Sequence, residues 1–517
     1  MSKFSIEEGK KGFLTLKYMD RYIHSKIDPV KEAERLIPEN INSNLFMILG
    51  LGLGYHLEVL LKKLEGKKCT LFVFEENQDL IQLYSRYGIV HDSRVIVFHS
   101  KDFDQFIHYF EKNIQAESIE HPVFIELKSE TVIFKNEYEK LRKRIEEFFR
   151  YHFQSLFTEA EFNILWYKNL IINSERIFNP AFNLFLEGDA LLISAGPTLA
   201  RNIPLLKSLY KKVPFFCVDT ALKPLVESGM IPEIIIASDA QIHNYKDFYH
   251  LPDQVFKQSI LACDVTVYYK IPELFSKVYF YRTENTADLF FEELNHSFGL
   301  SLPVFPSGGS VAASAFSLAY YLGVENMMMV GQDLGYSQIT HSRGTVHFDR
   351  ALIQSNKKET LLNFFQKIVF KRGKQDLFLK NLMRWMEDFI YLVRQTVYQI
   401  DPFVPLKNSN FGLPLDPYGR ICLFQKLSNR KSEVSLILGL FLEKLVKLRK
   451  ADTLEVFMKI RKDNLFQEAI DKLFLKQDLY LNRKQGNEQL YLGACYRIID
   501  RIIRAVEYLM KRKKNEL

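Results

Sequence analysis

The sequence predicts an α/β protein with three parts: an N-terminal α/β domain with a helical connector (residues 1–180), a central parallel-sheet domain (181–425) and a C-terminal helical domain (426–517). Three observations predict this class. At 517 residues the chain is long enough for about three ordinary domains. Through the first two parts, short apolar strands that end in glycine or polar turns alternate with helical segments. After residue 433, leucines recur at helical spacing.

The composition describes a folded chain that packs many aromatic rings. Hydrophobic residues make up 47% of it and charged residues 25%, which excludes wholesale disorder. The 43 Phe and 26 Tyr outnumber the 23 Gly and 17 Pro. A net charge of +7 is small for this length, so we expect no nucleic-acid partner, although a phosphate-bearing small molecule can still be bound.

Cysteine usage and hydropathy predict a cytoplasmic protein. The five cysteines never approach a CxxC or Cys/His metal spacing, which supports neither a disulfide framework nor a zinc site. The first 11 residues are polar and hold no apolar signal-peptide core. The longest uncharged run, 294–324, is interrupted by Pro303, Pro306, Gly308 and Gly309. The apolar stretch that remains is too short for a membrane span, which needs about 20 residues.

The N-terminal domain carries a glycine turn of the nucleotide-binding type. A short apolar strand at 45–49 leads into Gly50, Gly52 and Gly54, and Glu75 ends the next strand, 21 residues after the last glycine. In a Rossmann-like βαβ unit such glycines let the backbone approach a phosphate, and an acid at this distance meets a ribose hydroxyl. A tight strand-to-helix turn in a scaffold domain explains the same glycines. We favour that second interpretation and leave ligand binding here open.

Helical segments separate and follow the two sheets. Residues 135–179 are expected to form a helical connector rich in aromatic residues, with a domain boundary near residue 180. A further helix is expected at 376–398, followed by a connector at 401–420 that is rich in Pro, Asn and Gly. The apolar periodicity beyond residue 433 predicts a helical bundle.

Polar side chains follow the expected strands of the central domain. These strands are at 190–193, 214–218, 234–237, 259–263, 277–281 and 326–330. The polar residues that come after them are Ser194 and Thr198, Asp219 and Thr220, Ser238 and Asp239, and Asp333. Because the carboxyl ends of parallel strands meet at one edge of a sheet, we expect these side chains to converge on a single ligand crevice.

Two turns of the central domain have the composition of anion sites. Residues 194–198 (SAGPT) join a strand to a helix, and residues 307–310 (SGGS) precede the apolar helix at 311–322. Each turn would place backbone N–H groups at a helix N-terminus, where an anion is stabilised. An ordinary α/β turn explains each alone, but two in one crevice suggest a nucleotide. The P-loop, HExxH and GxSxG motifs are absent.

Several segments resemble a known family. LLISAGPTLARNIPLLKSL, CVDTALKPLVESGMIPEIIIASD and PSGGSVAASAFSLAYYLGVENMMMVGQDLGYSQITHSRG are similar to the motility-associated-factor (Maf) proteins, bacterial flagellin glycosyltransferases. YIHSKIDPVKEAERL and the unit from LFMILGLGLGYH to FVFEEN resemble the N-terminal region of that family. The central domain also resembles archaeal 6-hydroxymethyl-7,8-dihydropterin diphosphokinase (MptE-like). Its SAGPTL and SGGSV segments are similar to those of bacterial sialyltransferases, which implies a sialyltransferase-like sheet.

The resemblance implies transfer of a nonulosonic acid, of the pseudaminic or legionaminic type, from a CMP-sugar to Ser/Thr of flagellin. It implies donor binding by Ser194, Gly196, Pro197, Thr198, Asp219, Thr220, Asp239, Ser307, Gly308, Gly309, Ser310 and Gln332. It gives catalytic roles to Asp333, which would orient the sugar or acceptor, and to His341 as the base, with His347 as the second candidate. A surface position explains either histidine equally well. SAGPT replaces the commoner family pattern GxGPS, which leaves the donor contacts open.

Two other functions stay open. A diphosphokinase that uses ATP and Mg²⁺ would turn Asp219, Asp239 and Asp333 toward the metal, with Asp239 and Asp333 the candidate ligands; otherwise we expect no cofactor. A pterin kinase needs only the central domain, so the long flanking segments favour recognition of a protein acceptor. The third candidate is a non-catalytic flagellar assembly module, against which the intact polar strand ends argue.

Overall fold

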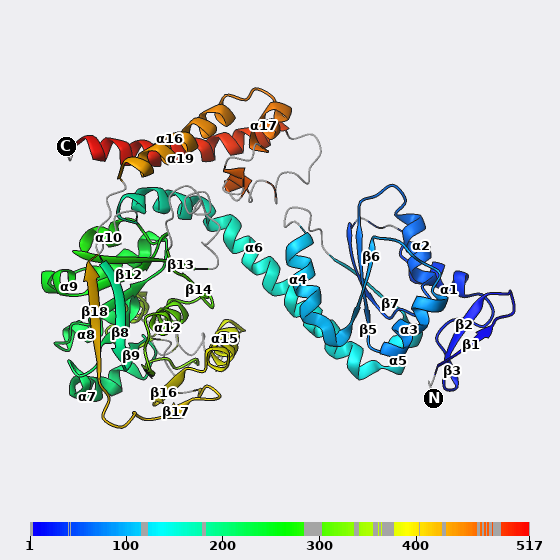
Figure 1. Cartoon of the computed structure of the whole chain (residues 1–517), viewed down its shortest axis with the longest axis horizontal. Helices are drawn as coiled ribbons and strands as arrows, with labels where there is room; N and C mark the ends of the chain where they lie inside the picture. Colours follow the sequence, from blue (N-terminus) through cyan, green and yellow to red (C-terminus); the bar gives the residue numbers. More distant parts are fainter. Residues whose placement is uncertain are drawn as a thin grey trace. The chain divides into compact units, whose positions relative to one another are not determined.

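The computed structural model describes residues 4–39, 41, 43–114, 122–177, 182–283, 302–335, 341–354, 360, 363, 377–402, 404–425, 431–462, 466–467, 470–471, 473–474, 478 and 488–515. The chain forms two compact units, Met1–Thr158 and Glu159–Leu517. Each contains a parallel sheet with helices, which confirms the predicted α/β class (Figure 1). The division falls inside one long helix, α6 (Lys135–Ile177), in the segment that the sequence predicts as a helical connector.

The first unit is built on a four-stranded parallel sheet in the order β6-β5-β4-β7. These strands are β4 (Leu45–Leu49), β5 (Thr70–Glu75), β6 (Val95–His99) and β7 (Val123–Glu126). The other elements are β1 (Phe4–Glu8), β2 (Leu14–Tyr18), β3 (Arg21–Tyr22), α1 (Pro29–Leu36), α2 (Tyr55–Lys63), α3 (Gln78–Tyr87), η1 (Ser100–Asp102), α4 (Phe103–Asn113) and α5 (Lys128–Ile133). The chain runs outward from β4 to β6 and returns to β7 on the other side of β4. The sheet therefore reverses its direction between β4 and β7.

Both faces of this sheet are buried, because successive side chains of β4 and β5 point into two different cores. Phe46 and Ile48 pack with α1, α2 and α3, whereas Met47 and Phe72 pack with α4 and the start of α6. The second core is largely aromatic: the rings of Phe72 and Phe106 meet edge to face with their centroids 5.2 Å apart. This core uses part of the high phenylalanine content noted in the sequence.

The second unit is built on a nine-stranded parallel sheet in the order β14-β13-β12-β11-β10-β9-β15-β16-β17. The strands are β9 (Ala190–Ile193), β10 (Phe215–Val218), β11 (Ile234–Ala237), β12 (Ile260–Asp264), β13 (Lys277–Thr283), β14 (Val304–Phe305), β15 (Asn326–Val330), β16 (Thr396–Ile400) and β17 (Asn410–Phe411). From β9 the chain runs to β14 on one side and then returns as β15 on the other side of β9. A separate antiparallel pair is formed by β8 (Phe182–Gly188) and β18 (Gly419–Gln425).

Helices cover this sheet and contribute side chains to its hydrophobic core. They are α7 (Leu199–Leu209), α8 (Asp219–Glu227), η3 (Ile242–Phe248), α9 (Asp253–Gln258), α10 (Lys270–Leu274), α12 (Val311–Tyr321), α13 (Val346–Gln354), α15 (Leu377–Val393), α16 (Lys431–Arg449), α17 (Leu454–Arg461) and α19 (Glu488–Asn515). The apolar α12 packs on β9, β10 and β11. Side chains of α16, α17 and α19 belong to the same buried cluster as the sheet, so the C-terminal helices are part of the second unit.

One expected helix is shorter than the sequence suggests. The helix predicted at 376–398 ends as α15 at Val393, and the chain turns at Arg394, whose φ is 54°. It then enters strand β16, because Thr396, Val397 and Tyr398 are β-branched or aromatic residues that fit a pleated sheet. Among the described residues, no helix combines the length and the apolarity that crossing a bilayer requires.

Candidate active site

The predicted polar strand ends lie along one edge of the nine-stranded sheet. β15, β9, β10 and β11 are consecutive neighbours and parallel, so their carboxyl ends present Asp333, Ser194, Asp219 and Asp239 side by side. The reversal of strand order falls between β9 and β15. In open α/β sheets the ligand crevice lies beyond the carboxyl ends at such a reversal point. The fold thus brings these predicted residues to the place where a ligand site is expected.

The SAGPT turn is closed by the carboxylate of Asp333. The Thr198 backbone N–H donates to Asp333 Oδ2 at 2.9 Å, and the Thr198 hydroxyl donates to Oδ1 at 2.7 Å. The Gly196 N–H donates to the carbonyl of Gly331 at 2.9 Å, and a Cβ at Gly196 would collide with that carbonyl and with Asp333. Asp333 therefore occupies the anion position at the start of α7. Pro197, which has no N–H, leaves this turn few amides for a donor phosphate.

A second carboxylate occupies the N-terminus of α8. Asp219 is buried; its Oδ1 accepts from the Thr220 N–H and its Oδ2 from the Asn244 side-chain amide, both at 2.8 Å. Asp239, at the end of β11, accepts from the Gln241 N–H at 2.8 Å. A third acid, Asp247 on η3, lies close enough to act electrostatically on Asp219. Three carboxyl groups thus gather beyond the ends of β10 and β11.

Burial and mutual repulsion favour the protonated forms of these acids. Burial, together with Asp247 and Asp239, raises the pKa of Asp219 well above its ordinary value. Burial also raises the pKa of Asp239. For Asp247, burial and the charge of Asp239 raise the pKa to about 7, although Arg350 acts in the opposite direction. The pKa of Asp247 therefore lies near neutrality, well above that of an isolated carboxyl group.

The predicted SGGS turn starts α12 with its own cap. Ser310 is the N-cap, and its hydroxyl accepts from the Ala312 N–H at 3.3 Å. Gly308 has a φ of 51° and packs so closely on the ring of Trp385 that a Cβ would collide with it. Ser307 is buried and Gly309 has a φ of 72°. The turn lies at the carboxyl edge, but in this state its helix end is already capped by a side chain.

The two candidate histidines stack on each other. The rings of His341 and His347 are 4.6 Å apart between centroids and nearly parallel. Burial and the neighbouring His347 lower the pKa of His341 to about 4, and burial with Arg350 lowers the pKa of His347. Both imidazoles are therefore neutral at pH 7. A neutral imidazole can accept a proton, but one with so low a pKa is a weak base.

Two contacts attach the histidine segment to the crevice. The Ser342 N–H donates to the Ala195 carbonyl at 2.9 Å, which sets His341 beside the SAGPT turn. Lys223 of α8 pairs with Asp349 of α13 at 2.6 Å. His347 and Arg350 are also on α13. The structure thus places His341, with His347 stacked on it, beside the turn that follows β9.

Two serine hydroxyls in this crevice are buried without a hydrogen-bond partner among the described residues. They are Ser194 Oγ, at the end of β9, and Ser342 Oγ, next to His341. A buried hydroxyl without a partner costs free energy, and such atoms commonly mark the place of a ligand or water. Gln332, which is also buried, lies between Gly331 and Asp333 after β15. These hydroxyls lack the hydrogen-bond partners that the capped helix ends have.

The acids do not form a metal site in this conformation. Within the parts of the chain that the structure describes, no three His, Cys, Asp or Glu side chains are grouped to hold a metal ion. Both oxygens of Asp333 and both oxygens of Asp219 already accept protein hydrogen bonds. Of the two candidate Mg²⁺ ligands, Asp333 therefore has both oxygens engaged by the protein, whereas Asp239 accepts one hydrogen bond, from the Gln241 N–H.

The glycine turn of the first unit is closed by three side chains. The N–H groups of Leu51, Gly52 and Leu53 donate to Glu75 Oε2 at 3.1 Å, Glu130 Oε2 at 3.0 Å and His24 Nε2 at 2.7 Å, respectively. A Cβ at Gly52 would collide with His24. The acid predicted to meet a ribose thus meets the backbone of its own turn. These contacts support the interpretation of the N-terminal turn as a scaffold.

Burial shifts the pKa values of the side chains that close this turn toward their neutral forms. Glu75 and Glu130 are fully buried, and the Tyr138 hydroxyl donates to Glu130 Oε1 at 2.5 Å. Burial and Glu130 raise the pKa of Glu75 well above its ordinary value, and burial raises the pKa of Glu130. Burial and the nearby His56 lower the pKa of His24 to about 3. The neutral His24 ring can therefore accept the Leu53 N–H bond.

Two asparagines of α6 hold the loops at the carboxyl edge of the central sheet. The Asn169 amide donates to the carbonyls of Ala240 and Thr266 at 2.9 and 3.0 Å. The Asn173 amide donates to the carbonyls of Val265 and Val267 at 3.1 and 3.0 Å. These carbonyls follow β11 and β12. The last turns of α6 therefore fix the loop that begins with Asp239.

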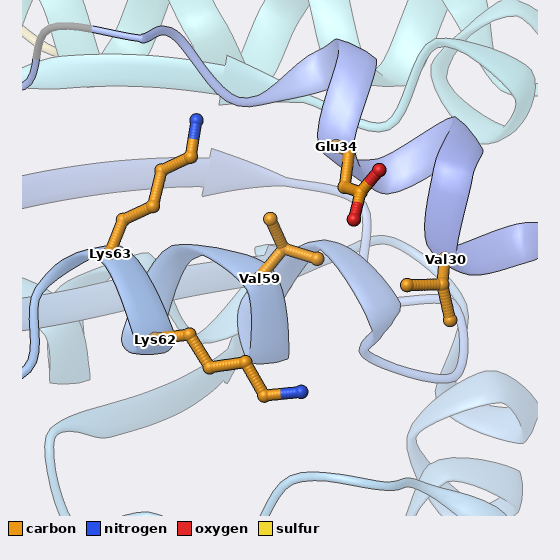
Figure 2. A pocket seen from close by; sticks show the side chains of 5 residues that line it. All are labelled: Val30, Glu34, Val59, Lys62 and Lys63. Atoms are coloured by element: carbon orange, nitrogen blue, oxygen red, sulfur yellow. The ribbon is translucent and has the colours of Figure 1, made fainter.

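A shallow hollow lies between α1 and α2 of the first unit, away from every predicted site residue (Figure 2). It encloses about 450 Å³ and is lined by Val30, Glu34, Val59, Lys62 and Lys63. Lys62 pairs with Glu58 at 2.8 Å, and Lys63 donates to the carbonyl of Pro38 at 3.2 Å. Both lysines thus have protein partners. We assign the hollow no function, and the candidate active site is the one at the carboxyl edge of the central sheet.

Sequence reasoning missed several of the residues that shape these sites. Asp247 and Asn244 lie on a short 3-10 segment rather than directly after a strand, so no strand-end pattern marks them. Glu130 lies 55 residues beyond Glu75, in a helix of its own. Ser342 directly follows His341, and this position beside a candidate base is the signal by which the sequence could have marked it.

Comparisons with known proteins give two family matches and a fold neighbour. Residues 2–89 match the glycosyltransferase Maf N-terminal domain, and residues 166–338 match the 6-hydroxymethylpterin diphosphokinase MptE-like family. The solved structure of a Maf glycosyltransferase from Magnetospirillum magneticum AMB-1 is similar in fold, with a TM-score of 0.57 and 13% identity, over 99% of this chain and 93% of that one.

Two uncharacterized proteins of Treponema pallidum (strain Nichols) are related in sequence. One is 31% identical over 147 residues, which are 26% of this chain, and the other is 29% identical over 94 residues, which are 18% of it. The chain spans only 36% and 45% of the lengths of these two relatives. The similarity to these two proteins is therefore limited to a segment of this chain.

Proposed function

We propose that the chain is a glycosyltransferase of the Maf type, as its matches to the Maf N-terminal domain and the MptE-like family indicate, and that it transfers a sugar from a nucleotide-activated donor to a protein hydroxyl. The family matches confirm the predicted resemblance. One observation supports the assignment of this activity to a site. At the reversal point of the central sheet, four polar strand-end residues converge: Ser194, Asp219, Asp239 and Asp333. The histidine segment closes on the same edge through the Ser342 to Ala195 hydrogen bond.

We further propose that the donor is a CMP-activated nonulosonic acid and that the acceptor is a Ser or Thr of flagellin in the cytoplasm. The support for donor and acceptor is the sequence resemblance to flagellin glycosyltransferases and sialyltransferases. The buried free thiols of Cys217 and Cys263 fit a reducing compartment. The small positive charge of the chain is compatible with an anionic donor held by local groups.

The contacts favour an unequal division of work among the predicted donor residues. Asp333, Gly196 and Thr198 shape the start of α7, since their polar groups bond one another. The hydroxyl groups of Ser194 and Ser342 are the donors left for a ligand. We assign Thr220, Pro197, Gln332 and the turn of Ser307, Gly308, Gly309 and Ser310 to the walls of the donor site. His341 and His347 stay candidates for contact with the acceptor.

A second candidate function, the diphosphokinase, is favoured by the MptE-like match over residues 166–338. That activity would require Mg²⁺ at the carboxyl edge. Asp333 accepts a hydrogen bond from Thr198, and Asp219 accepts one from Asn244. Because these carboxylates are engaged by the protein, the diphosphokinase has less support than glycosyl transfer.

Calorimetry with the full chain tests the choice of nucleotide. We expect CMP to bind at least about tenfold more tightly than ATP, a difference of about 1.4 kcal/mol, because the predicted donor carries one phosphate. CDP and 6-hydroxymethyl-7,8-dihydropterin complete the series. ATP binding that strengthens with Mg²⁺ and the pterin would establish the diphosphokinase instead. If the wild-type chain binds CMP but moves no sugar from a CMP-nonulosonic acid to flagellin, the proposed acceptor or the proposed sugar is wrong.

A further inference from the structure

Asp247 is a buried acid in the crevice that no motif marks. It lies on η3, which follows β11, and is 4% exposed. Its Oδ1 atom has no hydrogen-bond partner among the described residues. A buried carboxyl oxygen without a donor is costly unless a proton or a ligand reaches it. The position of Asp247 therefore points to a group that binds there during function.

The neighbouring acids differ from Asp247 in their contacts. Asp219 accepts hydrogen bonds on both oxygens, and Asp239 accepts one from the Gln241 N–H. The charged and titratable groups around the cluster are Asp219 and Asp239 at the strand ends, His243 on η3, Cys217 and Tyr281 beside Asp219, and Arg350, His347, Lys223 and Asp349 at α13 and α8. Arg350 acts on both Asp247 and His347, so it joins the acid to the histidine pair.

The proton affinities of Asp247 and His341 suit them to different roles. Burial lowers the pKa of His341 to about 4, which makes it a poor proton acceptor at neutral pH. Burial raises the pKa of Asp247 to about 7. A general base works best when its pKa lies near the working pH. Asp247 meets this condition and, unlike Asp219, also has a buried carboxyl oxygen that accepts no hydrogen bond from the described residues.

We propose that Asp247 is the general base that takes the proton of the acceptor hydroxyl, an inference that rests on the proposed function. The acceptor O–H bond breaks and its proton moves to Asp247 Oδ1, while the acceptor oxygen forms a bond to the anomeric carbon of the sugar. The bond from that carbon to the phosphate oxygen breaks, and its electron pair leaves with the nucleoside monophosphate. His341 then contacts the acceptor without carrying the proton.

The test compares wild type with Asp247→Asn in transfer from a CMP-nonulosonic acid to flagellin. We expect kcat/KM to fall about 10²- to 10⁴-fold, while the CMP affinity measured by calorimetry changes less than about threefold. The wild-type kcat/KM should rise with pH through about 7 as the base ionises, and the variant should lack this rise. Asp253→Asn, an exposed acid on the adjacent α9, is the matched control and should behave as wild type.

Several outcomes separate the base from a structural role. Transfer by Asp247→Asn within about threefold of wild type, or equal losses of CMP binding and transfer, overturns the assignment. If that variant does not fold, Asp247→Glu keeps the carboxyl and should transfer slowly with the rise in pH retained; a lost rise also overturns it. A wild-type chain that binds CMP and transfers nothing to flagellin overturns the proposed function instead.

Discussion

At the reversal point of the first sheet, the amides after β4 meet Glu75, Glu130 and His24, whereas at the reversal point of the second sheet the hydroxyl of Ser194 meets no partner among the described residues. Both units present a glycine-bearing turn after a buried strand. In the first, the protein supplies an acceptor to each of three successive amides. In the second, a carboxylate closes the helix end but leaves hydroxyl groups open. A glycine turn therefore indicates a ligand site only where polar atoms remain unsatisfied.

The largest expected effect is on the closed turn. Gly52→Ala places a Cβ against His24 at a φ of 49°, so we expect the first unit to lose more than about 3 kcal/mol of stability. Hydrogen exchange of the full chain measures this loss in the peptides of β4 to β7. Gly66→Ala is the control, because it shares a positive φ but has open space around it. CMP binding should persist in Gly52→Ala; its loss would place the nucleotide in the first unit.

The buried groups of the closed turn predict opposing responses to pH. The pKa of His24 is lowered to about 3, so its contribution to stability is present above about pH 6.5 and is lost as the pH falls. The pKa of Glu75 is raised, so its contribution is present in acid and is lost as the pH rises.

Exchange measured at pH 7 and pH 5, corrected for the intrinsic rates, checks these signs. Between pH 7 and pH 5, the free energy of unfolding of wild type should fall by about 2 kcal/mol more than that of His24→Gln. Over the same range, Glu75→Gln should lose more free energy of unfolding than wild type does. Identical pH responses in all three proteins would mean that the turn is not closed by these side chains.

The smallest effect on stability is expected at the open hydroxyl. Ser194→Ala removes a buried oxygen that has no partner in the described structure, so unfolding of the second unit should change by less than about 1 kcal/mol. Affinity for CMP or the CMP-sugar should nevertheless fall about fivefold, roughly 1 kcal/mol. Trp166 and Trp385 both lie in this unit and report its unfolding by fluorescence.

The matched control for Ser194→Ala is Ser317→Ala. The Ser317 hydroxyl donates to the Pro306 carbonyl at 2.7 Å, so this variant should lose about 1 kcal/mol of stability and keep its CMP affinity. If the two serine variants behaved alike in both measurements, the contrast between satisfied and open hydroxyls would not identify the ligand site.

The sequence was sufficient for most strands of both sheets and for the convergence of the polar strand ends, although it extended helix α15 into β16. Strand ends such as Ser194, Asp219 and Asp239 could be placed together because parallel strands share a direction. Partners could not be foreseen where they come from distant segments: Asp333 reaches Thr198 across 135 positions, and Glu130 reaches Gly52 across 78. Such contacts depend on packing, which periodicity does not encode. Asp247 was missed because it lies on a short 3-10 segment.

The asparagine pair on α6 determines where the chain can be cut. A fragment that begins at residue 181, the domain boundary expected from sequence, would lack Asn169 and Asn173 and the four carbonyl contacts that they make. It would also lack Tyr167, Leu170 and Ile171 from its core. The MptE-like match starts at residue 166 and includes all of them. For expression and crystallisation of the second unit, the chain should therefore begin near Glu159, with the last turns of the helix retained.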